Sequence, residues 1–385
     1  MKNKSKQYIF IICFVATFLI YGAQGSYTPY ISSYYQINGL NKLSIGLISC
    51  IGPLVAISIQ PMWGIISDKT GKRKLILQIL SLSSSLTMIL YLINNNPIML
   101  VISSFLYTSF SMAIVPLANA VITKSSRKYF FDYAHARLGG PLGYSSISLF
   151  VSFFIVLNPK SMFVICLIFY LLLFVAISLM PSELFTFKNE RIKKDSRKIF
   201  DTKEAYLILA LAVINTFGVS ILNTYIGPKV LDLGYNQSII GKLTFLMSVC
   251  ELPVLIFIKK FTKKYSALVM MNFSVFIAAT RLMFAASNSI ILIIACQAIE
   301  GLSYMVAFYA AVTYISEHCT PGNDSKAQTL LVMLESGVGA VLANIVGGFL
   351  TNSLGTSTSF YIMALFILTT MVIINIARRK GVVTD

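Results

Sequence analysis

The chain has 385 residues; 56% of them are hydrophobic, only 12% are charged, and the formal net charge is +17. Soluble domains carry about 25% charged residues, so this composition excludes an ordinary soluble protein and indicates a membrane protein. The six cysteines follow no metal-ligand or disulfide spacing, so we expect neither a metal site nor a disulfide framework.

Continuous apolar runs of about 20 residues recur along the chain and predict membrane-spanning helices. Helices are favoured over a barrel because the runs do not alternate, and only these two structures satisfy every backbone group in lipid. The first run is too long for the apolar part of a cleavable signal peptide, so we interpret it as a span. Twelve spans are predicted, near residues 8–30, 44–67, 74–93, 97–123, 136–157, 161–180, 203–231, 238–261, 265–286, 290–319, 326–353 and 359–378.

Basic residues distinguish the two sides of the membrane. Most of the 31 Lys and Arg residues fall in the two termini and in every second loop, whereas the opposite side receives only Lys42, Lys160, Lys229 and Lys242. Positive residues accumulate on the cytoplasmic side, so we predict a multi-pass protein of the plasma membrane with both termini in the cytoplasm. The basic charge then serves topology and contact with the lipid bilayer, and we expect no nucleic-acid partner.

A charged stretch divides the chain into two halves of six spans each. Residues 181–203 form the only long polar linker in the sequence, which places six-helix bundles at residues 1–180 and 204–385. The sequence GLNKLSIGLI at 39–48 aligns with GYNQSIIGKL at 234–243, which is typical of parallel repeats. We therefore predict an all-α polytopic membrane protein built from two repeated six-helix bundles.

The stretch GIISDKTGKRK interrupts the apolar pattern between the second and third spans. A tight turn needs a glycine with positive φ, which Gly71 supplies, but a basic turn alone does not explain Asp68. The stretch resembles the signature loop of the major facilitator superfamily, G-x-x-x-D-[RK]-x-G-[RK]-[RK]-[RK]. The resemblance implies a conformational latch in which Asp68 pairs with basic groups and with a helix end of the other half. The latch residues are Gly64, Asp68, Lys69, Gly71, Lys72, Arg73 and Lys74.

Four further stretches are similar to the branch of that superfamily that contains the lactose, phenylpropionate and nucleoside permeases. They are YGAQGSYTPY in the first span, FDYAHARLGGPLGY in the fifth, CELPVLIF in the eighth, and TRLMFAASNSIILIIACQAIEGLSYMVAFYAAVTYISE in the ninth and tenth. The resemblance implies the major facilitator fold of 12 transmembrane helices and proton-coupled symport. The chain departs from the branch where Asn119 replaces Asp, where Glu300 replaces a frequent His, and where Gly140-Pro141 replaces Gly-Ser.

Ionisable residues inside a membrane span cost roughly 2.5–3.5 kcal/mol each and are therefore functional candidates. Glu251, Arg281 and Glu300 fall in the eighth, ninth and tenth predicted spans. A buried carboxyl group beside an arginine can load and release a proton as a cavity switches sides. We predict that Glu300 carries the proton and that Arg281 drives its release; Glu251 is the second candidate for the carrier. The alternative is a purely structural ion-pair network that joins the three helices.

Arg137 lies at the cytoplasmic end of the fifth predicted span. A snorkelling arginine would serve topology only, but the family resemblance implies a substrate-binding arginine. With Asn119 in place of an acidic partner, Arg137 would bind an anionic substrate directly or hydrogen-bond a neutral one. Further polar residues in the first and seventh spans suit a polyol or a nucleoside, and their alternative role is contact between helices. They are Tyr21, Gln24 and Thr28, spaced for one helical face, and Asn215 and Asn223.

Together these features predict a secondary active transporter that moves a small-molecule substrate (a sugar, nucleoside or aromatic acid) by proton-coupled symport and alternating access. The alternative is a proton-driven efflux antiporter, because Gly140-Pro141 matches the middle of the G-x-x-x-G-P-x-x-G-G pattern of drug antiporters, although both flanks differ. The sequence contains no nucleophile–base or metal motif of an enzyme. We expect no cofactor besides the driving proton gradient, and a functional monomer.

Overall fold

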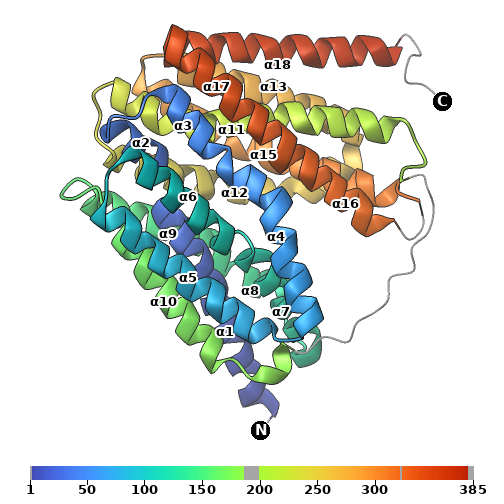
Figure 1. Ribbon diagram of the computed structural model, residues 1–385. Coiled ribbons are helices and arrows are strands. Elements are labelled where there is room, and N and C mark those ends of the chain that lie inside the picture. The colour runs from blue at the N-terminus through green and yellow to red at the C-terminus, as the bar shows by residue number, and fades with distance from the viewer. Residues whose placement is uncertain (1, 186–198, 321–322, 380–385) are drawn as a thin grey trace. The chain divides into compact units, whose positions relative to one another are not determined.

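The structure is a computed structural model that describes residues 2–185, 199–320 and 323–379 (Figure 1). The described residues are helical apart from connecting turns and one isolated β-bridge between Phe200 and Cys319. The predicted all-α fold is therefore confirmed. Most of the predicted linker at 181–203 lies outside the described residues, and the division of the chain at this linker stays a prediction.

The chain forms two compact units, and each is described by itself. The first unit contains α1 (Lys2–Tyr27), α2 (Ile31–Ile37), most of α4 (Ile51–Thr70), α5 (Arg73–Ile93), α6 (Pro97–Ser111), α7 (Ile114–Tyr129), α8 (Tyr133–Arg137), α9 (Gly139–Phe154), α10 (Ser161–Leu179), the 3₁₀ helix η1 (Ser182–Leu184) and the start of α12 (Ser238–Lys264). The second unit contains α3 (Lys42–Ser49), α11 (Glu204–Asp232), the rest of α12, α13 (Ala267–Ala286), α14 (Ile290–Ala298), α15 (Glu300–Glu317), α16 (Asp324–Val332), the π-helix η2 (Met333–Gly339), α17 (Ala340–Leu354) and α18 (Thr356–Arg379).

Each unit includes a short segment from the opposite half of the sequence. Residues 41–53 belong to the second unit, and residues 235–245 belong to the first. These segments overlap the two repeated sequences at 39–48 and 234–243. The two copies of the internal repeat therefore overlap the two segments that belong to the compact unit formed mainly by the other half of the sequence.

Eleven helical stretches of the described residues are long and apolar enough to cross a membrane, and they match eleven of the predicted spans. The predicted fifth span, 136–157, is shorter than expected, because α9 has only 16 residues and the small helix α8 precedes it. Pro141 has no N–H with which to bond the carbonyl of Arg137, so the helix is interrupted at that point.

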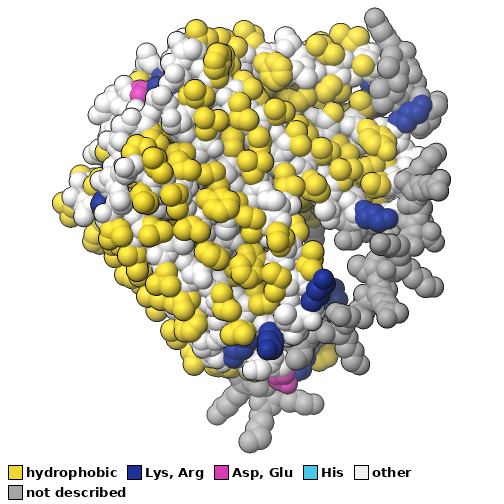
Figure 2. Space-filling view, in the orientation of Figure 1, with side chains coloured by type: hydrophobic (Ala, Val, Ile, Leu, Met, Phe, Trp, Pro, Cys, Tyr) yellow, Lys and Arg dark blue, Asp and Glu magenta, His cyan; other side chains and the backbone are white. Residues whose placement is uncertain are grey.

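Apolar side chains are spread widely over the face shown in Figure 2, and the basic side chains visible on it are few. Ile256, Ile291 and Phe153 are 73%, 72% and 63% exposed. A water-soluble monomer exposes no contiguous apolar surface of this extent, whereas a lipid bilayer solvates it. The spans and this surface together define a multi-pass membrane protein.

Glycines allow α9 to lie directly against α1 in the first unit. A Cβ atom on Gly143 would collide with the carbonyl oxygen of Phe18, and one on Gly139 would come 2.5 Å from the carbonyl oxygen of Phe14. Small residues let membrane helices gain the van der Waals contact that holds them together in lipid. The close approach at these two glycines fixes the start of α9, with the neighbouring Arg137, against α1.

Candidate functional site

The first unit holds a half-buried arginine among neutral polar groups. Arg137 is the last residue of α8, a helix capped by the side chain of Asp132, which accepts from the N–H of Ala134 at 2.8 Å. Its Nη1 donates to Oδ1 of Asn119 on α7 at 2.9 Å, and its Nη2 donates to the hydroxyl of Tyr21 on α1 at 3.1 Å. Three helices of this unit therefore converge on one guanidinium group.

No carboxylate neutralises Arg137 within the described residues, whose five ion pairs do not include it. Its guanidinium lies 5.7 Å from the centroid of the Tyr21 ring, and Tyr133 is a further polar neighbour. A guanidinium has five N–H donors, more than these neighbours occupy. The site therefore offers a positive charge with unused donors, which suits a hydroxyl, carbonyl or anionic group of a ligand.

Tyr133 was not among the predicted site residues. It lies four residues before Arg137, so both side chains share one face of α8. The signal was present in the sequence, but a five-residue helix is too short to be recognised from periodicity.

Two predicted residues of the first span lie outside this group. Gln24 is half-buried, and Thr28 is exposed and follows the last residue of α1. Within the described part of the chain, neither side chain hydrogen-bonds to Arg137, Asn119 or Tyr21. Their role in substrate binding stays a prediction.

The second unit holds a fully buried arginine at a break between two helices. Arg281 on α13 donates from Nε to the carbonyl of Cys296 at 3.0 Å, from Nη1 to Oγ of Ser303 at 2.9 Å and from Nη2 to Oε1 of Gln297 at 3.3 Å. Cys296 and Gln297 lie in the last turn of α14, and α15 begins at Glu300. The positive charge of Arg281 therefore stabilises the carbonyl end of α14, where the helix dipole is negative.

Glu300 occupies the other side of the same break, at the first position of α15. Its side chain is 3% exposed, and its Oε2 is buried without a hydrogen-bond partner in the described residues. A carboxylate is favoured at the positive end of a helix dipole. Broken membrane helices with charged groups at their half-helix ends form the ion and substrate sites of many transporters, and this break has that arrangement.

Glu251 on α12 completes the cluster of the second unit. Its carboxyl group lies close enough to Glu300 and Arg281 to interact electrostatically with both side chains. A Cβ atom on Gly301 would come 3.1 Å from the Cα of Glu251, so the glycine permits this close approach of α12 and α15. The structure thus brings the three predicted proton-coupling residues together, although Arg281 donates its hydrogen bonds to neutral groups and forms no ion pair within the described residues.

Asn215 on α11 joins this cluster, whereas Asn223 does not. The buried Nδ2 of Asn215 donates to the carbonyl of Ser303 at 3.2 Å, and its Oδ1 has no hydrogen-bond partner in the described residues. Asn223 is exposed. Eight residues turn an α-helix by about 80° beyond two full turns, so the two amides point to different faces of α11.

The predicted latch forms a compact turn in the first unit. Gly71 has a φ of 65°, as a tight turn requires. Asp68 forms an ion pair with Arg73, whose Nε also donates to Oγ of Ser67 at 3.0 Å. Lys74 donates to the carbonyls of Ser178 and Met180 at 2.9 and 2.6 Å and so caps the end of α10.

The remaining latch residues make fewer contacts. Lys69 and Lys72 are exposed, and a Cβ atom on Gly64 would meet no atom within 4 Å. Neither lysine forms an ion pair within the described part of the chain. The latch function stays a prediction.

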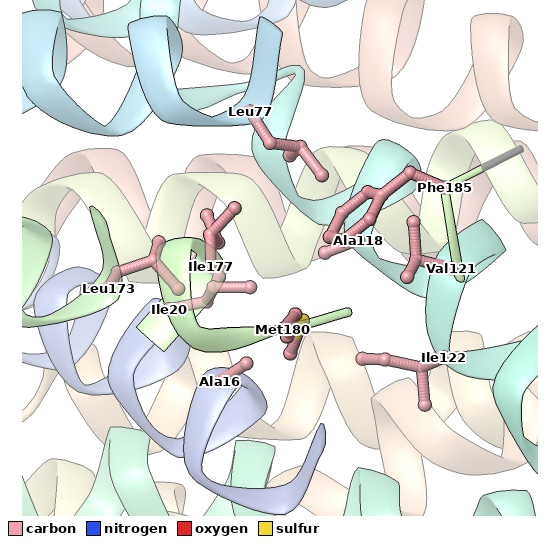
Figure 3. A pocket seen from close by; sticks show the side chains of 10 residues that line it. All are labelled: Ala16, Ile20, Leu77, Ala118, Val121, Ile122, Leu173, Ile177, Met180 and Phe185. Carbon is pink, nitrogen blue, oxygen red and sulfur yellow. The ribbon is translucent and has the colours of Figure 1, made fainter. Parts of the chain in front are cut away.

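A cavity in the first unit does not add a binding site. It has a volume of about 10 Å³, and only apolar side chains line it, such as Ile20, Leu173 and Met180 (Figure 3). This is the size of at most one water molecule, and a water needs polar partners. Among the described residues, no group of three or more His, Cys, Asp or Glu side chains could hold a metal ion.

The membrane spans, the buried charges and the signature turn define a polytopic transporter, and comparison with known proteins gives its family. Residues 11–362 match the MFS_1 like family. The chain therefore belongs to this family of the major facilitator superfamily, which confirms the membership predicted from the signature turn.

Characterised and uncharacterised transporters are similar to this chain. The uncharacterized transporter YwbF of Bacillus subtilis is 25% identical over 333 residues, which cover 85% of this chain and 82% of the relative. The maltose permease of Geobacillus stearothermophilus is 25% identical over 339 residues, which cover 86% and 85%. The crystal structure of the nucleoside transporter NupG matches with a TM-score of 0.80 at 15% identity, covering 95% of this chain and 98% of that one. This chain is accordingly a transporter and not an enzyme.

Proposed function

We propose that this transporter is a proton-coupled symporter that imports a small polar solute by alternating access. A sugar and a nucleoside are the preferred solute classes, and an aromatic acid ranks after them. The observation that carries the proposal is the second-unit cluster, in which buried Glu300 and half-buried Glu251 interact with each other and with Arg281. The names of the maltose permease and of the nucleoside transporter NupG support the choice of solute class.

The carboxyl pair provides the proton step. Two neighbouring carboxylates repel each other when both are ionised, and a proton on one of them removes this repulsion. The buried Oε2 of Glu300, which has no partner in the described residues, is an acceptor for that proton. Arg281 lies close enough to favour the ionised form once the proton has a path to water. Loading and release would then follow the side to which the cluster is open.

The arginine of the first unit provides the solute step. Arg137 offers N–H donors, Asn119 offers an amide, and the hydroxyl and ring of Tyr21 offer a hydrogen bond and a stacking surface. Sugars and nucleosides carry hydroxyl and carbonyl groups that bind such side chains. We assign substrate binding to these three residues together with Tyr133, and keep Gln24, Thr28, Asn215 and Asn223 as further candidates.

The proposal includes location and assembly. The distribution of Lys and Arg supports a place in the plasma membrane with both termini in the cytoplasm. In that orientation the turn of Asp68 and Arg73 is cytoplasmic and serves as the conformational latch. The proposal also includes a functional monomer, in which one chain supplies both candidate clusters.

Uptake by proteoliposomes tests this proposal. An imposed inward proton gradient should drive accumulation of at least one labelled solute from a panel of maltose, lactose, a nucleoside and phenylpropionate. The matched protein with both Glu251→Gln and Glu300→Gln should equilibrate that solute without concentrating it. Full gradient-driven accumulation by this double variant would refute the proton assignment, and solute movement only against the proton flow would favour the efflux alternative.

A further inference from the structure

An open groove of about 460 Å³ lies in the first unit where α5 and α9 end and α10 begins. Its walls include Phe150 and Phe154 of α9, whose ring centroids are 4.9 Å apart, and Val164 of α10. These three side chains are 47%, 43% and 42% exposed. Because α5 and α10 span the membrane and the groove lies at their ends, it opens at the boundary between lipid and water.

One end of the groove carries Lys160, the only charged residue among the described residues that line it. Its Nζ donates to the carbonyl of Leu92 at 2.8 Å, which uses one of its three N–H donors. Lys160 is the N-cap residue of α10 and makes no side-chain cap. A cation is disfavoured at the positive end of a helix dipole, so this lysine does not stabilise the helix. Two positive features therefore meet at one end of an apolar groove.

Neutral polar groups complete that end. The buried Oγ of Ser161 has no hydrogen-bond partner in the described residues. Asn158 accepts from the backbone N–H of Lys160 at 2.9 Å through Oδ1, and its amide donors remain for another acceptor. No Asp or Glu lines the groove within the part of the chain that the structure describes. The hydroxyl of Ser161 is enclosed, so the polar end offers the ammonium of Lys160 and the amide of exposed Asn158 to an anionic acceptor.

We propose that this groove binds an acidic phospholipid. Its phosphate would contact Lys160 and Asn158, and one acyl chain would lie along Phe150, Phe154 and Val164. A free anion would leave the apolar wall uncovered, and a zwitterionic lipid would bring its own cation close to the ammonium and so weaken the attraction of its phosphate. The groove volume lies within the range of about 300–1,000 Å³ of small-molecule sites, enough for a headgroup and part of a chain. In the orientation proposed above this lipid belongs to the outer leaflet.

Native mass spectrometry of the delipidated full-length protein tests the site, with phosphatidylglycerol and phosphatidylcholine of identical acyl chains as probes. The unmodified protein should retain more phosphatidylglycerol than phosphatidylcholine. Lys160→Gln should lower phosphatidylglycerol retention about fivefold. Lys242→Gln, which removes an exposed lysine outside the groove, should leave it unchanged. Val164→Trp, at an exposed position, should fill the groove and lower retention of both lipids.

Three results would overturn the proposal: equal retention of the two lipids, unchanged retention after Lys160→Gln, or an equal loss after Lys242→Gln. Displacement of the lipid by glycerol 3-phosphate alone would identify a free-anion site and would also overturn it. Glu300→Gln should retain phosphatidylglycerol as the unmodified protein does. A failed lipid test therefore leaves the proton-coupling proposal standing, and a failed coupling test leaves the lipid site standing.

Discussion

The two units each place an arginine in a membrane environment, but they surround it differently. Arg137 is half-buried and hydrogen-bonded to Asn119 and Tyr21. Arg281 is 0% exposed and holds three acceptors around a helix break, with Glu300 and Glu251 close by. The comparison shows that burial and the number of hydrogen-bond partners distinguish two roles of an arginine side chain. A half-buried arginine with two hydrogen-bond partners can take a ligand, whereas a fully buried arginine with three partners holds a site in place.

Loss of Arg281 should have the largest effect. Arg281→Met would leave the carbonyl of Cys296, the amide oxygen of Gln297 and the nearby carboxyl groups without their donor or counter-charge. Each unsatisfied buried group costs about 1–3 kcal/mol, so we expect the free energy of unfolding in detergent to fall by about 3 kcal/mol or more. The matched Arg137→Met should cost only about 1 kcal/mol. Equal losses for the two variants would break the comparison.

Arg137→Met should instead weaken solute binding. A hydrogen bond from a charged donor to a ligand contributes about 1.5–3 kcal/mol. The loss of one such bond should therefore raise the Kd of the solute about tenfold to a hundredfold. Isothermal calorimetry with the solute found in the uptake panel measures this. Asn119→Asp is the informative companion, because a carboxylate beside Arg137 would neutralise it and weaken binding of an anionic solute more than that of a neutral one.

Glu300→Gln should uncouple transport with a smaller energetic effect. A gradient of one pH unit drives about tenfold accumulation per coupled proton, and this accumulation should disappear. Exchange of labelled for unlabelled solute, which needs no net proton movement, should continue. Loss of exchange together with accumulation would mean that Glu300 holds the structure rather than the proton.

Glu183 supplies a solvent-exposed reference for the buried groups, with the smallest expected effect. The hydroxyl of Tyr129, at 2.6 Å, and then the ammonium of Lys128, at 2.9 Å, hold the pKa of this carboxyl below its usual value. A folded-state pKa below the unfolded value gives stability that is present above the unfolded pKa of about 4.3 and is lost as the pH falls through the folded one. A small difference in melting temperature between the unmodified protein and Glu183→Gln should therefore be present at neutral pH and absent in acid.

Much of the architecture could be predicted because a membrane restricts the options. Apolar runs predicted eleven spans that the structure contains, and Arg137, Asn119 and Arg281 stood out because a polar residue in such a run needs a reason. The shortened fifth span followed from Pro141, whose missing N–H outweighs the apolar pattern of its neighbours.

Other features depend on contacts that no local pattern encodes. The break at Ile299 is stabilised by Arg281, which lies 15 residues or more from its acceptors in α14 and α15. Asn223 is exposed because it lies on a different face of α11 from Asn215, and tertiary packing decides which face is buried. The assignment of residues 41–53 and 235–245 to opposite units is tertiary as well, although the repeated sequences at these places were visible.

Solute-induced proton movement tests the central claim most directly. The transported solute is added to proteoliposomes that contain the unmodified protein. No gradient is imposed, the membrane potential is clamped at zero, and an electrode records the pH of the outer medium. Symport predicts alkalinisation in step with solute uptake, and none with Glu300→Gln. Solute uptake by the unmodified protein without any change in pH would contradict the account.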